Sequence, residues 1–191
     1  MRLSTEIQTF LEKSTTKSFL IIANEFVKLL EEEQIEEDNF VSRAHDKLIE
    51  LYSAGQKLEQ IGLKYSNHQS DFEHLDPEYF LERNKSIISL LGKDTFYWEV
   101  FDPTYSESDG NPDGGWKISD KEASQGWLVD DFADIYRDLK TGLEQMKIGT
   151  DEAIEDALWD MKWSFINHWG DHCISAMRYL HFLHYEGKLV M

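Results

Sequence analysis

Apolar residues recur at intervals of three and four along most of the chain, the spacing that places them on one face of an α-helix. Phe19, Ile22, Phe26 and Leu29 show this pattern near the N-terminus. It predicts helices over residues 5–13, 19–30, 39–52, 76–91, 127–146 and 150–185. The last of these would be about 52 Å long if it were unbroken. The sequence therefore predicts an all-α bundle of about five or six helices, with this long C-terminal helix at its centre.

The segments between the predicted helices are of two kinds. Residues 95–101 are aromatic and β-branched, and we expect a buried connector there because a lone strand cannot form a sheet. Residues 102–118 hold two prolines and several Asp-Gly and Asn-Pro turns, which predict an acidic loop within a single domain spanning 1–191. Residues 109–114 match the first half of a calcium-binding loop, but its twelfth position is Asp120 where Glu is needed. We therefore expect no calcium there.

The charge balance limits the classes of partner. The chain has 19 Lys and Arg against 37 Asp and Glu, for a net charge of −18. This charge argues against nucleic acid and against docking on anionic lipid, since both need basic surface. A single cysteine excludes an internal disulfide and a cysteine-rich zinc site. No run of apolar residues approaches the length of a membrane span, so we expect a cytoplasmic protein with a reduced thiol.

Three aspartates lie on one shoulder of the helix predicted over 127–146. Asp131, Asp134 and Asp138 follow the spacing i, i+3, i+7, beside a core stripe that includes Leu128, Phe132 and Ile135. Like charges at this spacing destabilise a helix by about 0.2–0.5 kcal/mol per pair, so the group needs a cationic partner. The candidates are Arg137 or Lys140 on the same helix, a histidine of another helix, or a metal ion. The alternative is a solvated acidic shoulder.

Two histidines lie four residues apart on the C-terminal helix, so that both imidazoles project to one side. His172 falls within an apolar stripe and His168 at its edge, and we expect His172 to contact the aspartates. One interpretation is a core histidine hydrogen-bonded to a carboxylate. The other is a divalent metal site, for Mn, Fe, Ni or Zn, with Asp131, Asp134, Asp138, His168 and His172 as ligands or general base. Gly170 between them predicts a helix crossing close to its Cα.

Two hypotheses about function follow. The first is a protein-interaction or adaptor domain that offers an acidic surface and an aromatic-rich groove and contains a buried Asp–His network. The alternative is a divalent-metal-binding protein or a metal-dependent hydrolase that uses the Asp-rich and His-rich helices. The sequence lacks G-x-S-x-G, Walker and G-x-G-x-x-G motifs, and it indicates no cofactor besides a metal. It leaves enzymatic activity, partner identity and oligomeric state open.

Three strings of the sequence carry a resemblance to a known family. They are YWEVFDP at 97–103, DDFADIYRDLKTGL at 130–143 and HWGDH at 168–172, the last followed by RYLH at 178–181. In this order they resemble an uncharacterised bacterial family, domain of unknown function 5063, from about Phe19 to His184. The resemblance implies an all-helical bacterial domain with no assigned activity, and it transfers no catalytic residue. Relative to that pattern, residues 106–117 look like an insertion.

Overall fold

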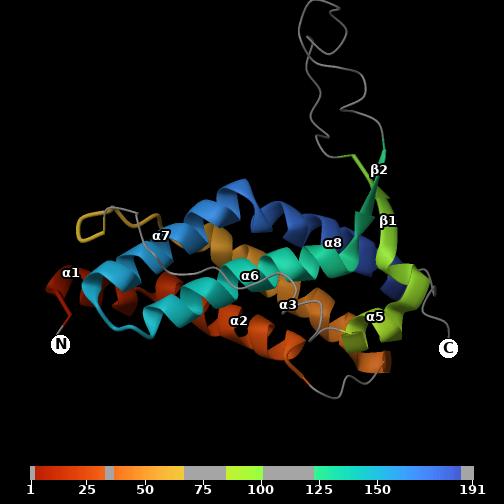
Figure 1. Ribbon diagram of the computed structural model, residues 1–191, viewed down its shortest axis with the longest axis horizontal. Coiled ribbons are helices and arrows are strands. Elements are labelled where there is room, and N and C mark those ends of the chain that lie inside the picture. The colour runs from red at the N-terminus through yellow and green to blue at the C-terminus, as the bar shows by residue number, and fades with distance from the viewer. Residues whose placement is uncertain (1–2, 33–36, 67–84, 101–122, 186–191) are drawn as a thin grey trace, which may run out of the picture.

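The computed structural model describes residues 3–32, 37–66, 85–100 and 123–185, and these residues form seven α-helices, a short 3-10 helix and one small sheet (Figure 1). The helices are α1 (Thr5–Glu12), α2 (Ser14–Leu30), α3 (Glu37–Lys57), α5 (Lys85–Leu91), α6 (Leu128–Met146), α7 (Asp151–Asn167) and α8 (Trp169–Tyr185). The 3-10 helix η1 spans Gly92–Thr95, and the strands are β1 (Phe96–Glu99) and β2 (Ser124–Trp127). The predicted all-α class is confirmed.

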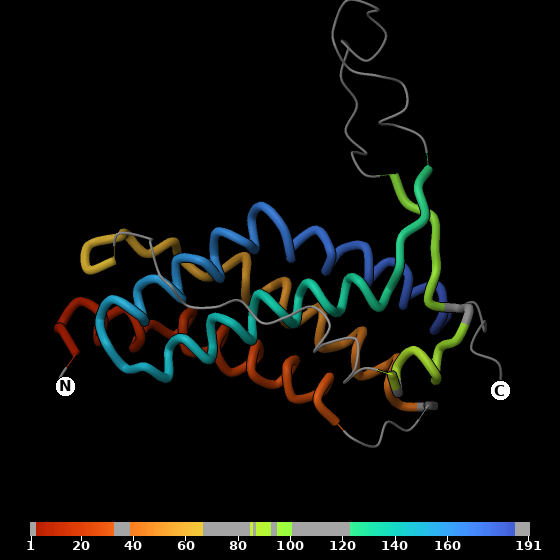
Figure 2. Tube along the Cα trace, viewed as in Figure 1, coloured from red at the N-terminus to blue at the C-terminus, as the bar shows by residue number. Residues whose placement is uncertain are grey.

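Four helical rods make up the bundle, namely α2, α3, α6 and the succession of α7 and α8 (Figure 2). α2 packs on α3 and α6, and α8 packs on α3, α6 and α7. The core is rich in large aromatic side chains. Phe132 of α6 meets Phe26 of α2 and Phe40 of α3 edge to face, and Trp169 of α8 stacks on Phe19 of α2. These rings are fully buried, and they fix α6 and α8 against the α2–α3 pair.

The C-terminal helix is broken, contrary to the prediction of one rod over 150–185. α7 ends at Asn167, and His168 has φ −149° and ψ −89°, outside the helical region. The broken backbone requires glycine at position 170, because a Cβ there would lie 2.2 Å from the carbonyl oxygen of Phe165. The close neighbour expected at Gly170 is therefore the end of α7. The predicted crossing by a separate helix is wrong.

Residues 96–99 also depart from the prediction, since they form a strand where a buried connector was expected. β1 pairs antiparallel with β2, with Phe96 opposite Trp127 and Tyr97 opposite Gly126. Side chains of β1 alternate between exposed and half-buried, and Trp98 is 70% exposed. Residue types do not indicate β2, because its sequence Ser-Gln-Gly-Trp contains no β-branched residue. Gly126 leaves room for the ring of Tyr97, which an added Cβ would approach to 2.5 Å.

The remaining predictions on the fold have mixed outcomes. The predicted end of the helix over 76–91 is confirmed, since α5 ends at Leu91 and Gly92 has a φ of +52°. Residues 76–84 and the acidic loop 102–118, with its calcium-like motif, lie outside the described residues. In the described part of the chain, no helix combines the length and apolar character that crossing a membrane requires.

Candidate metal centre

α6 carries its three aspartates along the edge of a buried apolar face. Leu128, Phe132, Ile135 and Leu139 are fully buried, and Asp131 lies between them near the start of the helix with only 4% of its surface exposed. The side chains of Asp134 and Asp138 are 17% and 15% exposed. The predicted alternative of a solvated acidic shoulder is therefore wrong, because all three carboxylates are largely screened from water.

Two histidines lie beside this edge, His168 at the break between α7 and α8 and His172 in α8. Trp169 anchors the start of α8, since its ring is fully buried and its Nε1 donates to the carbonyl of Met161 at 3.1 Å. His168 and His172 flank this anchor with ring centroids 5.0 Å apart. Both imidazoles are about one-third exposed or less, at 35% and 26% of the side chain. Both are thus held at a site that water and a small ligand can reach.

Each imidazole has one nitrogen fixed by its own carboxylate. Nδ1 of His168 lies 2.8 Å from Oδ2 of Asp138, and Nδ1 of His172 lies 2.8 Å from Oδ1 of Asp131. The predicted contact between His172 and the aspartates is confirmed. In each pair the carboxylate orients the ring and accepts a hydrogen bond from Nδ1–H.

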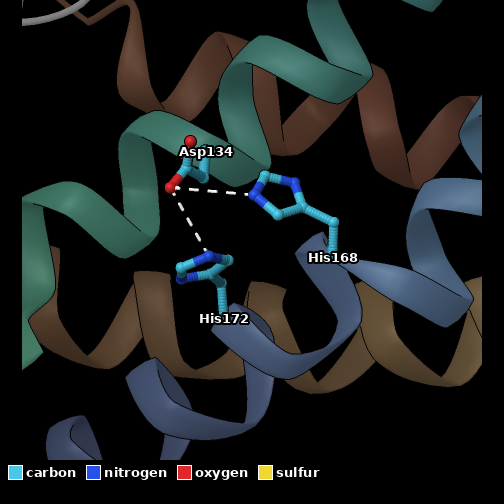
Figure 3. A group of neighbouring side chains, drawn as sticks. All are labelled: Asp134, His168 and His172. Carbon is cyan, nitrogen blue, oxygen red and sulfur yellow. Dashed lines mark ion pairs between the residues drawn. The ribbon is translucent and has the colours of Figure 1, made fainter.

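The other ring nitrogens converge on Asp134. Nε2 of His172 lies 3.4 Å from Oδ2 of Asp134, and Nε2 of His168 lies 4.0 Å from the same atom (Figure 3). Asp134, His168 and His172 each offer a ligand atom, and these atoms lie within 4.8 Å of one another. Two imidazole nitrogens and a carboxylate oxygen so placed have the spacing of a metal-ligand set.

Two further side chains complete the cluster, and sequence analysis missed the first of them. The hydroxyl of Tyr97 on β1 donates to Oδ2 of Asp131 at 2.6 Å, so both oxygens of that carboxylate have partners. The guanidinium of Arg137 on α6 contacts two of the aspartates. Its Nη2 lies 2.6 Å from Oδ1 of Asp134, and its Nε lies 3.9 Å from Oδ1 of Asp138. Lys140, the other candidate, instead pairs with Glu31 and Glu144.

Burial and charge set the protonation of this cluster. Burial raises the pKa of Asp131 above its usual range, although hydrogen bonds from His172 and Tyr97 oppose the shift. Burial lowers the pKa of His172, but the hydrogen bond to Asp131 and the charges of Asp131 and Asp134 outweigh it, so the pKa is raised overall. Burial and the charge of Asp131 raise the pKa of Tyr97 far above its usual range, so its hydroxyl remains a donor.

Cys173 takes no part in this chemistry. It follows His172 on α8 but points into the core, where it is fully buried. Burial raises the pKa of its thiol well above the usual value, so the nucleophilic thiolate is suppressed. All five residues predicted as metal ligands or base lie together, whereas their role toward a metal stays a prediction.

Comparison with known proteins places the chain in a family. A match to the domain of unknown function DUF5063 covers residues 11–186. The chain belongs to this family. Protein BF1032 from Bacteroides fragilis, known from a crystal structure, is similar to it with a TM-score of 0.71 and 22% identity, over 92% of this chain and 96% of that one. This similarity concerns the fold alone. No curated protein matches the chain.

Proposed function

We propose that this DUF5063 member binds a divalent first-row transition metal through Asp134, His168 and His172. The observation that carries the proposal is the arrangement of the two imidazoles, whose Nδ1 atoms are tied to separate carboxylates while their Nε2 atoms face one oxygen of Asp134. Metal-binding histidines commonly donate their second N–H to a carboxylate, which fixes the tautomer and the ring. Asp131 and Asp138 have this position here.

The charge of the cluster supports the same proposal. Arg137 lies within ion-pair distance of Asp134 and Asp138, whereas the partners of Asp131 are His172 and Tyr97. Among the described residues of this cluster, the three carboxylates, when ionised, thus exceed the one guanidinium by two negative charges. Two imidazolium protons or one divalent cation would balance them. Charges of one sign buried this closely are costly when they are not compensated. A divalent cation bound at Asp134 would therefore neutralise the excess negative charge of the three aspartates.

The donor set indicates the kind of metal and chemistry. Two imidazole nitrogens and one carboxylate oxygen suit Zn, Fe, Mn or Ni, and they are poor ligands for calcium. Three protein ligands leave a coordination position for water or a substrate. A metal held there would supply Lewis acidity, so metal-assisted hydrolysis is the reaction class to test first. In this proposal Tyr97 holds Asp131, which orients His172, and Arg137 holds the ligand Asp134 itself.

Metal content is the direct test. We expect protein purified without a histidine tag to contain close to one equivalent of a transition metal by elemental analysis. After chelator treatment, Co²⁺ titration should restore one equivalent and give the visible absorption of cobalt with nitrogen and oxygen ligands. Protein that is metal-free as purified and binds Co²⁺ only at millimolar concentration would contradict the proposal.

Variants separate this site from adventitious binding. His172→Ala and Asp134→Asn should each lower Co²⁺ affinity by at least about tenfold, because each removes or weakens one ligand. His184→Ala is the matched control, since His184 is exposed near the end of the same helix. Circular dichroism checks that each variant is folded. If the control loses as much affinity as the ligand variants, the metal binds elsewhere.

The interaction-domain hypothesis remains a second prediction. It rests on the net charge of −18 and on exposed apolar side chains such as Trp98 and Ile166, which are 70% and 62% exposed. A metal-free protein would favour it over the metal-binding proposal. A cytoplasmic location, a bacterial origin, a protein partner and the absence of nucleic-acid binding stand with it as proposals from the sequence.

A further inference from the structure

The strand β1 passes the C-terminal half of α8 (Figure 2). A pocket of about 340 Å³ is lined by residues of both elements. Its walls are mainly aromatic, and the rings come from Phe96, Tyr97, Trp98, Tyr179 and Phe182. Tyr97 and Tyr179 stack on one another with centroids 4.9 Å apart. Its volume lies at the lower end of the range for small-molecule sites, which extends from roughly 300 to 1,000 Å³. Its shape and lining therefore suit a small ligand with an apolar group.

Two opposite charges line the same pocket without neutralising each other. Glu99 of β1 accepts a hydrogen bond from the hydroxyl of Ser175 at 3.1 Å. Arg178 lies one helical turn further along α8, and among the described residues no carboxylate lies within ion-pair distance of it. Arg178 therefore differs from Arg137, which has two such partners. The pocket thus offers a carboxylate and a guanidinium, and no ion pair joins the two.

We propose that this pocket binds a zwitterionic α-amino acid with an aromatic side chain. The ammonium group would lie at Glu99, the carboxylate at Arg178 and the ring among the aromatic walls. Guanidinium and carboxylate groups form charge-assisted, often bidentate hydrogen bonds, and stacked rings prefer an aromatic guest. A ligand with only one charge would leave the opposite charge of the pocket unpaired, which is unfavourable once water is displaced. The pair of charges therefore selects for a zwitterion.

The proposed site does not depend on a metal. Tyr97 is nevertheless common to both sites, since its ring lines the pocket while its hydroxyl holds Asp131. Titrations in the presence of a chelator therefore test the pocket by itself. Failure of the metal proposal would leave these titrations unchanged, and failure here would leave the cobalt titrations unchanged.

The experiment compares one ligand with two truncated analogues by isothermal titration calorimetry. L-phenylalanine carries both charges, 3-phenylpropionate lacks the ammonium group and 2-phenylethylamine lacks the carboxylate. We expect saturable binding of L-phenylalanine and at least about tenfold weaker binding of both analogues. D-phenylalanine and glycine measure the contributions of handedness and of the ring, and glycine should bind at least about tenfold more weakly.

Two variants should exchange the preference between the analogues. Arg178→Gln should weaken L-phenylalanine at least about tenfold and strengthen 2-phenylethylamine relative to it, because the opposed cation is gone. Glu99→Gln should weaken L-phenylalanine similarly and strengthen 3-phenylpropionate relative to it. Lys147→Gln is the control, since this exposed lysine lies at the end of α6 and does not line the pocket.

Several outcomes would overturn the proposal. These are a lack of saturable binding of L-phenylalanine, analogues that bind as tightly as it does, and unchanged affinity in Arg178→Gln or Glu99→Gln. Binding of a peptide that begins with phenylalanine, without binding of the free amino acid, would also overturn it and would assign the pocket to a polypeptide partner.

Discussion

Glu155 of α7 and Asp131 of α6 are both buried carboxylates, and their hydrogen bonds are satisfied in different ways. Glu155 of α7 is 1% exposed, and one of its oxygens accepts the backbone N–H groups of Lys64, Tyr65 and Ser66 at 2.6–2.8 Å. Asp131 of α6 is 4% exposed, and its partners are the side chains of Tyr97 and His172. The two carboxylates are buried to a similar extent, but Glu155 accepts hydrogen bonds from the main chain and Asp131 accepts them from side chains.

The difference shows which buried charge can take part in chemistry. Backbone amides keep their protons at every physiological pH, so Glu155 holds the loop after α3 against α7 and has no exchangeable partner. An imidazole can lose its proton or exchange it for a metal ion, so the partner of Asp131 can change. Burial alone therefore does not identify a functional site in this fold. The kind of donor that faces the carboxylate does.

The largest expected effect concerns Glu155. Glu155→Ala should lower the free energy of unfolding by about 3–5 kcal/mol, because three backbone donors lose their buried, charged acceptor together. Urea unfolding measures it, and Glu152→Ala, exposed on the same helix, is the control. Co²⁺ binding by the folded variant should be unchanged. A variant that is as stable as the control would show that the loop does not depend on this carboxylate.

Gly170→Ala should come next, with a loss of about 2–3 kcal/mol, because the added Cβ would collide with the carbonyl oxygen of Phe165. The collision lies between the two histidines, so Co²⁺ affinity should fall as well. Gly62→Ala has nothing within 4 Å of its added Cβ and serves as the control. If Gly170→Ala raises the melting temperature, α7 and α8 form one continuous helix.

Tyr97→Phe tests the side-chain donors of Asp131. Loss of the hydroxyl should lower stability by about 1–2 kcal/mol, because Asp131 keeps His172 but loses its second donor. Co²⁺ affinity should fall roughly tenfold or more, as expected when a group that orients a metal ligand is loosened. Tyr185→Phe, at an exposed tyrosine of α8, is the control. An unchanged cobalt affinity would show that Tyr97 does not help to position the metal ligands.

The smallest expected effect is a dependence on pH in metal-free protein. The pKa of His172 is raised by Asp131 and Asp134 despite burial, so the folded state binds its proton more tightly than the unfolded state does. The stabilisation is complete below about pH 6.5, the ordinary value, and is lost as pH rises through the raised pKa. The pKa of Asp131 is also raised, so its contribution to stability likewise falls as the pH rises.

The measurement is the difference in free energy of unfolding between wild type and His172→Gln, taken from about pH 6 to about pH 9 with chelator present. This difference should shrink as the pH rises. The corresponding difference for Glu155→Ala should stay constant over the same range, because its donors are backbone amides. A His172 difference that grows with pH would contradict the assigned direction.

Sequence spacing accounts for much of the site. The interval i, i+3, i+7 placed Asp131, Asp134 and Asp138 on one edge of α6. The two histidines both meet this edge, but they do so across the break at His168 and not from one continuous helical face. The aspartate spacing is a local regularity of a helix, so it can be read without knowing the fold. The need for a cationic partner then led to the correct pairing of His172.

The missed features depend on contacts between distant parts of the chain. Tyr97 lies 34 residues before Asp131, and it reaches that carboxylate only because β1 pairs with β2. The break at His168 depends on Gly170 meeting a carbonyl oxygen, whereas a lone glycine within an apolar stripe is compatible with a continuous helix. Neither feature has a periodic signal, so a single sequence does not predict it.

The contact between Glu155 and the loop after α3 also determines how this region exchanges hydrogen with solvent. Lys64, Tyr65 and Ser66 belong to no helix or strand, yet their amides point at a buried oxygen. Their protons can reach deuterated water only when the loop separates from α7. These three amides should therefore exchange as slowly as those in the middle of α7, and the loop and that helix should open as one cooperative unit.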